Sequence, residues 1–408
     1  MTAKVQTYEE IDRTEWEKLV RESRTGTWFQ SPEAYDFYAS LPELMEPFVY
    51  AISSQQSVIS SQESGNSNRL SVISSQESEI SSQLSAFSHQ KIEINEQNQE
   101  CGLRAVCVGY VTKERSTVKQ FFTRRAIIIG GPVFANDATL EEVETLMMAV
   151  RNQFKILDFK FKILNAPIYI ETRNFNDYSC WKEAFEAAGF AYKKHLNFHV
   201  DCRDKEKICE RLSDNRKRQI RHAKQNGATI TKLSNDENDI REWYEILREL
   251  YRTRVKTPLF TLKFFIKAHR QGIGKFLLVK HEGKVIGGSM VVMSEGNNEL
   301  KSERINELKN GGMSEGTVYE WFECGLNAEY KELYPSVMAT YAGIEFASEN
   351  GYARYDMMGA GEPGVPYGVR DFKAEFGGEL VEHGRFLCVC KPLLYQLGTV
   401  GVRILRKS

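Results

Sequence analysis

The stretch from Tyr355 to Gly378 gathers residue types that can hold a charged ligand. It reads Tyr-Asp-Met-Met-Gly-Ala-Gly-Glu-Pro-Gly-Val-Pro-Tyr-Gly-Val-Arg-Asp-Phe-Lys-Ala-Glu-Phe-Gly-Gly. Its glycines permit positive φ and close approach of a ligand to the backbone. Arg370 offers a planar fork for phosphate or carboxylate, and Lys373 stands between Phe372 and Phe376, which can exclude water and strengthen its field. The alternative is a turn whose lysine stem covers aromatic rings.

This stretch resembles the C-terminal signature of the FemABX family of peptidoglycan bridge-forming aminoacyltransferases. The resemblance rests on Asp356, the Gly-Ala-Gly after it, and the run Tyr-Gly-Val-Arg-Asp-Phe-Lys-Ala-Glu-Phe-Gly-Gly from Tyr367. It implies two tandem GNAT-like domains, with Lys373 in the catalytic channel. It also implies an aminoacyl-tRNA donor, a lipid-linked or nucleotide-linked peptidoglycan precursor as acceptor, and no cofactor.

Near the N-terminus, Phe29-Gln-Ser-Pro-Glu33 resembles a second segment of the family. Ser31 is expected to cap a helix that has Pro32 at its first position. Some family members carry a lysine one helical turn later, where it meets the nucleotide diphosphate of the acceptor. The matching position here is Tyr38, a candidate substrate-binding residue, and this departure leaves the acceptor open.

Two further basic stretches are candidate binding surfaces. Residues 211–227 are expected to form a helix with only a thin apolar stripe, which is typical of a solvated basic face. The alternative, favoured by a similar helix in the family, is that Arg216, Arg218 and Arg221 contact phosphates of RNA or of a diphosphate-linked sugar. Arg254 lies in a second cluster of cations, between Tyr251 and Pro258.

The implied chemistry is aminolysis of an activated ester, in which the enzyme mainly positions both partners and stabilises an oxyanion. Lys373 would hold the developing negative charge, while Arg370 and Tyr367 would orient the tRNA end or a pyrophosphate. Glu323 is the candidate general base, and an ordinary cross-strand pair with a lysine is its alternative. The expected catalytic residues are therefore Lys373 and Glu323.

An acyl-CoA donor is disfavoured by the sequence. Acetyltransferases that use acyl-CoA usually hold its pyrophosphate on a glycine-rich loop at a helix N-terminus. The corresponding segment, residues 327–336, has no glycine. Two alternatives stay open: an acyl-CoA-dependent N-acyltransferase of a sugar or exopolysaccharide amine, and a non-catalytic relative that binds cell-wall precursors.

The order of the expected elements is typical of an α/β (α+β) fold in which each domain has a mixed, mainly antiparallel sheet flanked by helices. We expect the first domain at 1–200, with strand 193–201 at its end, a low-complexity insertion at 53–100, and completion by 383–408. We expect the second domain at 201–382, with a polar insertion at 294–316. There is no room for a coiled-coil arm between the helices expected at 237–254 and 261–270.

Bulk composition restricts partners and location. The formal net charge is −1, so contact with nucleic acid or membrane requires a local patch. The eight cysteines lack the spacing of a zinc site, and no metal is expected. The N-terminus has no secretory signal, and no apolar run reaches the ~20 residues of a membrane span. These features predict a cytoplasmic protein, with helix 391–408 as a possible contact with the inner face of the membrane. The oligomeric state stays open.

Overall fold

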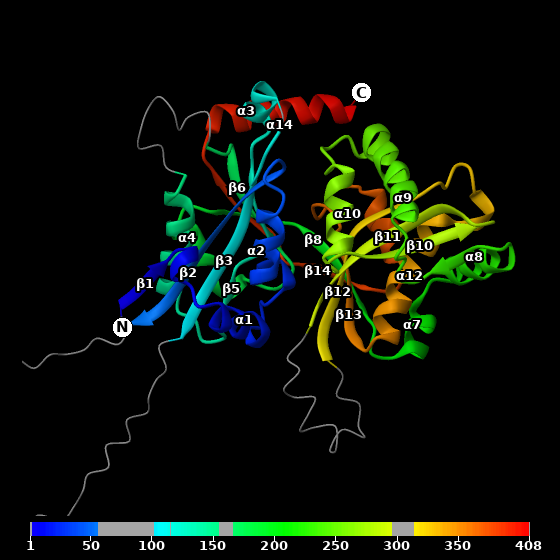
Figure 1. Cartoon of the computed structure of the whole chain (residues 1–408), viewed down its shortest axis with the longest axis horizontal. Coiled ribbons are helices and arrows are strands. Elements are labelled where there is room, and N and C mark those ends of the chain that lie inside the picture. The colour runs from blue at the N-terminus through cyan, green and yellow to red at the C-terminus, as the bar shows by residue number, and fades with distance from the viewer. Residues whose placement is uncertain (1, 56–101, 115, 155–165, 296–313, 408) are drawn as a thin grey trace, which may run out of the picture.

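The computed structural model describes residues 2–55, 102–114, 116–154, 166–295 and 314–407 (Figure 1). Most of the two insertions expected at 53–100 and 294–316 lies outside these residues. None of the helices in the described ranges is long and apolar enough to cross a membrane.

The first sheet has the strand order β1-β2-β3-β4-β6-β15-β7, and β5 pairs with β3. All neighbours are antiparallel except the parallel pair of β4 and β6. The strands are β1 (Thr2–Gln6), β2 (Met45–Gln55), β3 (Leu103–Thr112), β4 (Ala126–Gly130), β5 (Val133–Phe134), β6 (Tyr169–Asn174), β7 (Ala191–Lys193) and β15 (Arg385–Val389). The helices of this half are α1 (Arg13–Glu22), α2 (Pro32–Ala39), α3 (Thr117–Thr123), α4 (Leu140–Asn152), α6 (Lys182–Ala187) and α14 (Pro392–Lys407).

The second sheet has the order β14-β8-β13-β12-β11-β10-β9, in which only β12 and β13 run parallel. Helix α12 (Pro335–Glu349) connects these two strands, as a parallel pair requires. The strands are β8 (Leu196–Asp201), β9 (Thr229–Thr231), β10 (Lys275–His281), β11 (Lys284–Ser294), β12 (Ser314–Gly325), β13 (Tyr352–Gly359) and β14 (Glu379–Glu382). The other helices are α7 (Lys205–Arg211), α8 (Asp214–Gln225), α9 (Glu237–Leu250), α10 (Leu262–Arg270) and α13 (Gly368–Ala374).

The hydrophobic cores order these elements into layers (Figure 1). Helices α4 and α6 cover the outer face of the first sheet, and α8 and α12 cover the outer face of the second. One shared core between the sheets contains α1 and α2 from one half and α9 and α10 from the other. Phe29 contacts Trp321 across this core, with ring centroids 5.0 Å apart, and Phe37 contacts Phe264 at 5.2 Å. The two halves are therefore packed together through aromatic side chains.

Strand β8 corrects one expectation about the first domain. Strand β7 stops at Lys193, and the chain then crosses to the second sheet, where β8 pairs with β13 and β14. Leu196, Phe198 and Val200 are buried in the core of the second sheet, so burial favours this position. The stretch 193–201 does not finish the first domain. The first sheet instead receives β15, from near the end of the chain, which lies between β6 and β7.

The local signals for α2 and for the link between α9 and α10 agree with the structure. The Ser31 hydroxyl accepts a hydrogen bond from the Ala34 amide, and Pro32 is the first helical residue. Helix α9 is followed by the π-helical turn η4 (Tyr251–Val255), a short loop and α10. The structure describes this whole segment, and it contains no coiled-coil arm. The expected α/β arrangement without an arm is confirmed.

Candidate functional site

A cavity of about 660 Å³ lies between the two sheets. The first half contributes the inner face of β3, β4 and β6, and the second contributes η4, the loop after it, and the ends of β12 and β13. Its polar lining is mainly cationic: Lys113, Arg125, Arg173 and Arg385 line it together with His195, Glu43 and Glu114. Glu43 is paired with Lys263, at 2.5 Å. The balance of charge favours an anionic ligand.

Two arginines of this cavity are fixed by a shared carboxylate. Arg173 Nε lies 2.9 Å from Glu171 Oε2, and Arg385 Nη1 lies 3.0 Å from Glu171 Oε1. Burial by itself would raise the pKa of Glu171, but the two guanidinium groups outweigh it and hold this pKa at about 2. Glu171 is therefore ionised and orients both arginines toward the cavity.

His195 completes this group as a neutral imidazole. Burial and the Arg385 charge lower its pKa to about 3, so its Nε2 can accept a hydrogen bond from Arg385 Nη2 at 2.9 Å. Arg125, on the same wall, has a buried Nε with no hydrogen-bond partner among the residues that the structure describes. The first domain thus presents three guanidinium groups and one internal carboxylate.

The sequence analysis did not identify this arginine group. A signal was available in Glu171-Thr-Arg173, because alternate residues of a strand share one face and Ile170 and Thr172 are buried. The other partner, Arg385, lies on β15, which is distant in sequence. Only the pairing of β15 with β6 brings it beside Glu171.

The end of β13 forms the floor of the cavity through Met358 and Gly359. Its pairing with β8 shifts register between Asp356 and Gly359, and Met358 has φ of 57°, a left-handed conformation that costs a non-glycine residue roughly 1–2 kcal/mol. Buried Asp356 supports this turn, because its Oδ1 accepts a hydrogen bond from the Met358 amide at 2.6 Å. Its other oxygen lies 3.2 Å from His199 Nε2. The bulge turns two backbone carbonyls away from the sheet ladder.

Lys373 occupies the space that this bulge creates. It is buried in α13, and its ammonium donates hydrogen bonds to the Met357 carbonyl and, at 2.9 Å, to the Gly359 carbonyl. Burial lowers the pKa of Lys373, and nearby carboxyl groups, Glu320 foremost, act in the opposite direction. Lys373 is not itself in the cavity wall, but it holds the Gly359 backbone that is.

Behind the strand ends, Lys373 faces a buried group on the α12 side of β12. Glu320 Oε1 accepts hydrogen bonds from Tyr355 Oη and Thr340 Oγ1, each at 2.9 Å. Burial raises the pKa of Glu320. Burial and the Glu320 charge raise the pKa of Glu323 to about 8, against smaller effects of Ser336 and Lys373. Glu323 Oε1 is buried without a hydrogen-bond partner.

Replacing Glu323 with glutamine tests this raised pKa through stability. A carboxyl group whose pKa rises from 4.5 to about 8 on folding binds more protons in the folded state, so its contribution is lost as pH rises through that window. Relative to Glu323→Gln, the wild-type protein should therefore lose stability between pH 5 and pH 8. Urea unfolding at both pH values measures the difference. A difference that does not change with pH would contradict the raised pKa.

Arg216, Phe372 and Phe376 form a stack that joins α8 to α13. The Arg216 guanidinium lies over both rings, with its Cζ 4.5 Å from the Phe372 centroid and 5.0 Å from that of Phe376, and Nη2 donates to the Phe372 carbonyl at 3.2 Å. Arg216 is buried, so it is not placed to bind phosphate at the surface of α8 as the sequence suggested. Arg221 is exposed on the same helix. The two phenylalanines therefore hold Arg216 against the α13 segment.

Replacing Arg216 with alanine should destabilise the protein by roughly 2–4 kcal/mol, because a desolvated cation–π contact and a hydrogen bond from a charged donor are both lost. Arg221→Ala is the matched control on the same helix and should change stability by less than about 0.5 kcal/mol. Urea unfolding of both variants measures the difference. Equal stability of the two variants would show that the stack does not hold α13.

The remaining sequence candidates differ in their access to the cavity. All described hydrogen bonds of the Arg370 guanidinium go to carbonyls of the 360–365 loop, those of Ala360, Glu362 and Val365, so it fixes this loop. Tyr367 is exposed and does not line the cavity. Arg254 is exposed on η4.

Tyr38 lies away from the cavity. Its side chain is buried in the shared core, packed against Tyr110 with ring centroids 5.0 Å apart. It is therefore not placed to contact the acceptor. Some family members have a lysine at this position, one turn beyond the N-terminal motif, and Tyr38 carries no such charge. The arginine group of β6 and β15 supplies positive charge in the cavity instead.

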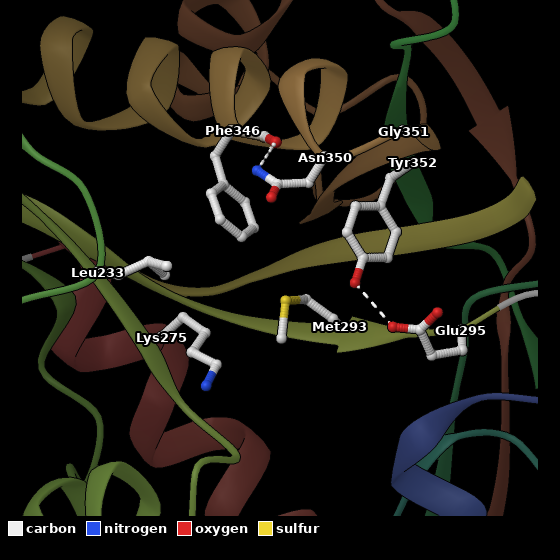
Figure 2. A pocket seen from close by; sticks show the side chains of 8 residues that line it. All are labelled: Leu233, Lys275, Met293, Glu295, Phe346, Asn350, Gly351 and Tyr352. Atoms are coloured by element: carbon white, nitrogen blue, oxygen red, sulfur yellow. Dashed lines mark hydrogen bonds between the residues drawn. The ribbon is translucent and has the colours of Figure 1, made fainter.

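A second cavity, of about 280 Å³, lies at the opposite end of the second sheet (Figure 2). Its side chains come from the start of β10 and β13, the end of β11 and helix α12, and include Lys275, Met293 and Phe346. Tyr352 Oη hydrogen-bonds Glu295 at 3.0 Å (Figure 2). None of the sequence candidates lines it, and among the described residues no cluster of His, Cys, Asp and Glu could hold a metal ion. The larger cavity is therefore the better candidate site.

Part of this chain matches a known family, and its fold matches solved structures. Residues 313–400, which carry Glu323, Asp356 and Lys373, match the model of the FemAB family. The whole chain resembles the crystal structure of FemX, with a TM-score of 0.55 and 12% identity over 97% of this chain and 99% of that one. It also resembles a tandem GNAT protein from the clavulanic acid biosynthesis pathway, with a TM-score of 0.50 and 8% identity over 95% and 98%. No curated protein gives a significant match. The C-terminal part of the chain, residues 313–400, thus matches the FemAB family, and the whole chain shares the fold of FemX and of a tandem GNAT protein.

Proposed function

We propose that this protein is an aminoacyltransferase that moves an amino acid from aminoacyl-tRNA to an amine of a peptidoglycan precursor, forming an amide bond. The observation that carries the proposal is the arginine-lined cavity whose floor, at Gly359, is held by the buried ammonium of Lys373. The family match covers the segment that forms this floor.

The acceptor binds in the cavity between the domains. Its phosphates contact Arg173 and Arg385, which Glu171 holds in place on the facing sheet. Arg125 adds a guanidinium with an unused buried Nε, and exposed Arg254 adds long-range attraction beside η4. Both lipid-linked and nucleotide-linked precursors carry a diphosphate, so this chemistry suits either.

Lys373 stabilises the negative charge that develops on the ester carbonyl oxygen. An ammonium has three N–H donors, and two of them bind the carbonyls of Met357 and Gly359. Because Lys373 does not line the cavity, the ester carbonyl has to reach past Gly359 to meet it. The third N–H, which has no acceptor among the described residues, then donates to the oxyanion, and burial strengthens this interaction because the local dielectric constant is low. The two carbonyls fix the direction in which the third donor points.

Glu323 is the group that can accept the proton of the attacking amine. A carboxylate with an ordinary pKa is a weak base at neutral pH. The Glu323 carboxylate, with a pKa of about 8, is a stronger base and is better suited to take the proton from the ammonium group that forms when the amine attacks. Glu323 lies on the α12 side of β12 and does not line the cavity, so it takes up the proton through an intervening water and not by direct contact with the amine. The amine nitrogen forms the new bond to the carbonyl carbon, and the tRNA ribose hydroxyl leaves.

The N-terminus of α12 favours tRNA over acyl-CoA as the donor. Pro335, its first residue, has no amide hydrogen, and the Ser336 amide donates to Asn327 Oδ1 at 3.1 Å. The Met338 amide is bonded to the Tyr334 carbonyl. Pro335 and Ser336 therefore offer no free amide to a pyrophosphate at this helix N-terminus.

A donor competition tests the proposed function. Purified protein is incubated with lipid-linked or nucleotide-linked precursor, together with a charged tRNA pool or a panel of acyl-CoA esters. The expected product is a precursor heavier by one aminoacyl residue, formed only with charged tRNA and lost when the tRNA is deacylated. Transfer from acyl-CoA alone would instead identify an N-acyltransferase.

A further inference from the structure

We propose that α3 and α14 together form a membrane-docking face that binds an anionic lipid surface and brings the cavity to a lipid-linked acceptor. This inference rests on the proposed function and selects the lipid-linked over the nucleotide-linked precursor. The face is defined here by Phe122 on α3 and by Leu393 and Leu397 on α14. Figure 1 shows both helices along one edge of the molecule.

Helix α14 presents apolar side chains to solvent. Leu393 is 78% exposed and Leu397 is 66% exposed, and their i, i+4 spacing places them on one face of the helix. The inner side of the helix is anchored differently: Tyr395 contacts Tyr169 of the first sheet, with ring centroids 5.7 Å apart. An amphipathic helix that lies flat on its own domain in this way suits the membrane interface.

Helix α3 extends the same face. Phe122 is 58% exposed, and it packs edge-on against Phe121, at 5.1 Å between centroids. Lys391, the residue just before α14, lies over the Phe121 ring with its Nζ 5.1 Å from the centroid. The two helices are therefore in contact, and their exposed apolar residues belong to one surface.

The charge of these segments fits an anionic lipid surface. Residues 116–130 and 385–408 contain lysines and arginines but no aspartate or glutamate. Arg403, Arg406 and Lys407 stand in the last turns of the α14 sequence, whereas the ammonium of Lys391, just before the helix, is buried against Phe121. Exposed apolar groups flanked by cations are the combination that binds anionic membranes, because neither signal alone is strong.

The docking face adjoins the cavity. Lys113 and Ser116, just before α3, line the cavity, and so does Arg125, just after it. A membrane that contacts Phe122 therefore lies beside this wall of the cavity. A precursor anchored in that membrane by its lipid can place its diphosphate at the arginine group, whereas a soluble nucleotide-linked precursor gains nothing from such docking.

Cosedimentation with vesicles tests the proposal without any donor or acceptor. The full-length protein is mixed with vesicles of phosphatidylglycerol and phosphatidylcholine, or of phosphatidylcholine alone. We expect binding to the anionic vesicles, weakened by salt. The double variant Leu393→Asp/Leu397→Asp should bind at least about tenfold more weakly, because two exposed leucines can no longer enter the interface. Phe122→Asp should also bind more weakly.

Leu140→Asp is the matched control, because Leu140 is an exposed leucine at the start of α4 where an acidic residue is tolerated. It should bind vesicles like the wild type, and thermal unfolding should show that all variants are folded. Absence of wild-type binding to anionic vesicles would overturn the proposal. Wild-type dimerisation that the double variant abolishes, without vesicle binding, would also overturn it and assign the face to a second copy.

The test separates this inference from the proposed function. Transfer to a soluble nucleotide-linked acceptor should be the same in wild type and double variant, whereas transfer to a lipid-linked acceptor in vesicles should fall with vesicle binding. Loss of both transfers would overturn the docking role of α14. Vesicle binding without transfer from tRNA would leave the docking face supported and reject the proposed function.

Discussion

Lys373→Met should lower the rate of aminoacyl transfer on the order of 10²–10³-fold, which is the usual cost of removing one oxyanion donor. The protein should remain folded. Methionine fills the volume of the lysine stem, and burial already raises the pKa values of Glu320 and Glu323. Loss of the ammonium raises both pKa values further, so these carboxyl groups can take up a proton when the cation is removed. Single-turnover transfer assays give the rate, and thermal unfolding checks the fold.

Two controls make this result specific. Lys284→Met applies the same substitution at an exposed lysine at the start of β11 and should leave transfer unchanged. Lys373→Arg keeps the charge but cannot reproduce the directions of the three ammonium hydrogens, so it should rescue little activity. Full activity in folded Lys373→Met would show that this lysine only supports the β13 bulge.

Arg173→Gln and Arg385→Gln should each weaken binding of a phosphate-bearing acceptor by about 10–100-fold, because each removes charged hydrogen bonds worth roughly 1.5–3 kcal/mol. Glu171 keeps one arginine partner in either single variant, so the fold should survive. Isothermal titration with the precursor, repeated at increasing salt, measures the loss. The maximal rate at saturating acceptor should change much less than KM.

Glu171→Gln is the opposing control for the arginine group. It removes the internal negative charge and leaves both arginines unneutralised, so it should bind the precursor as tightly as the wild type or more tightly, while it lowers stability. A common weakening in all three variants would mean that the group supports the fold of the cavity wall. Unchanged binding in both arginine variants would place the acceptor's phosphates elsewhere.

The sequence was most informative where one short segment carries the whole signal. Lys373 and the turn after Asp356 lie within one stretch of 24 residues counted from Tyr355 to Gly378, so the motif could be recognised before the fold was known. The same is true of the cap of α2, because a capping serine and a first-turn proline act locally. The raised pKa of Glu323 needed the fold, because it depends on burial by α12.

The arginine group could not be predicted because its parts come from distant strands. Arg173 and Arg385 meet only because the chain crosses to the second sheet at β8 and returns at β15. The same crossing explains why 193–201 was misassigned, since alternating apolar residues predict a strand but do not say which sheet it joins. Arg216 shows the reverse error: a basic helix suggests a phosphate surface, yet one of its cations is buried between two rings.

The position of the acceptor's phosphates is the most direct test of the account. A crystal structure with a bound peptidoglycan precursor should place them within hydrogen-bond distance of Arg173 and Arg385, with the accepting amine beside Gly359 above Lys373. A precursor bound in the smaller cavity beside Lys275, or on the outer face of α8, would contradict a transfer site between the two domains.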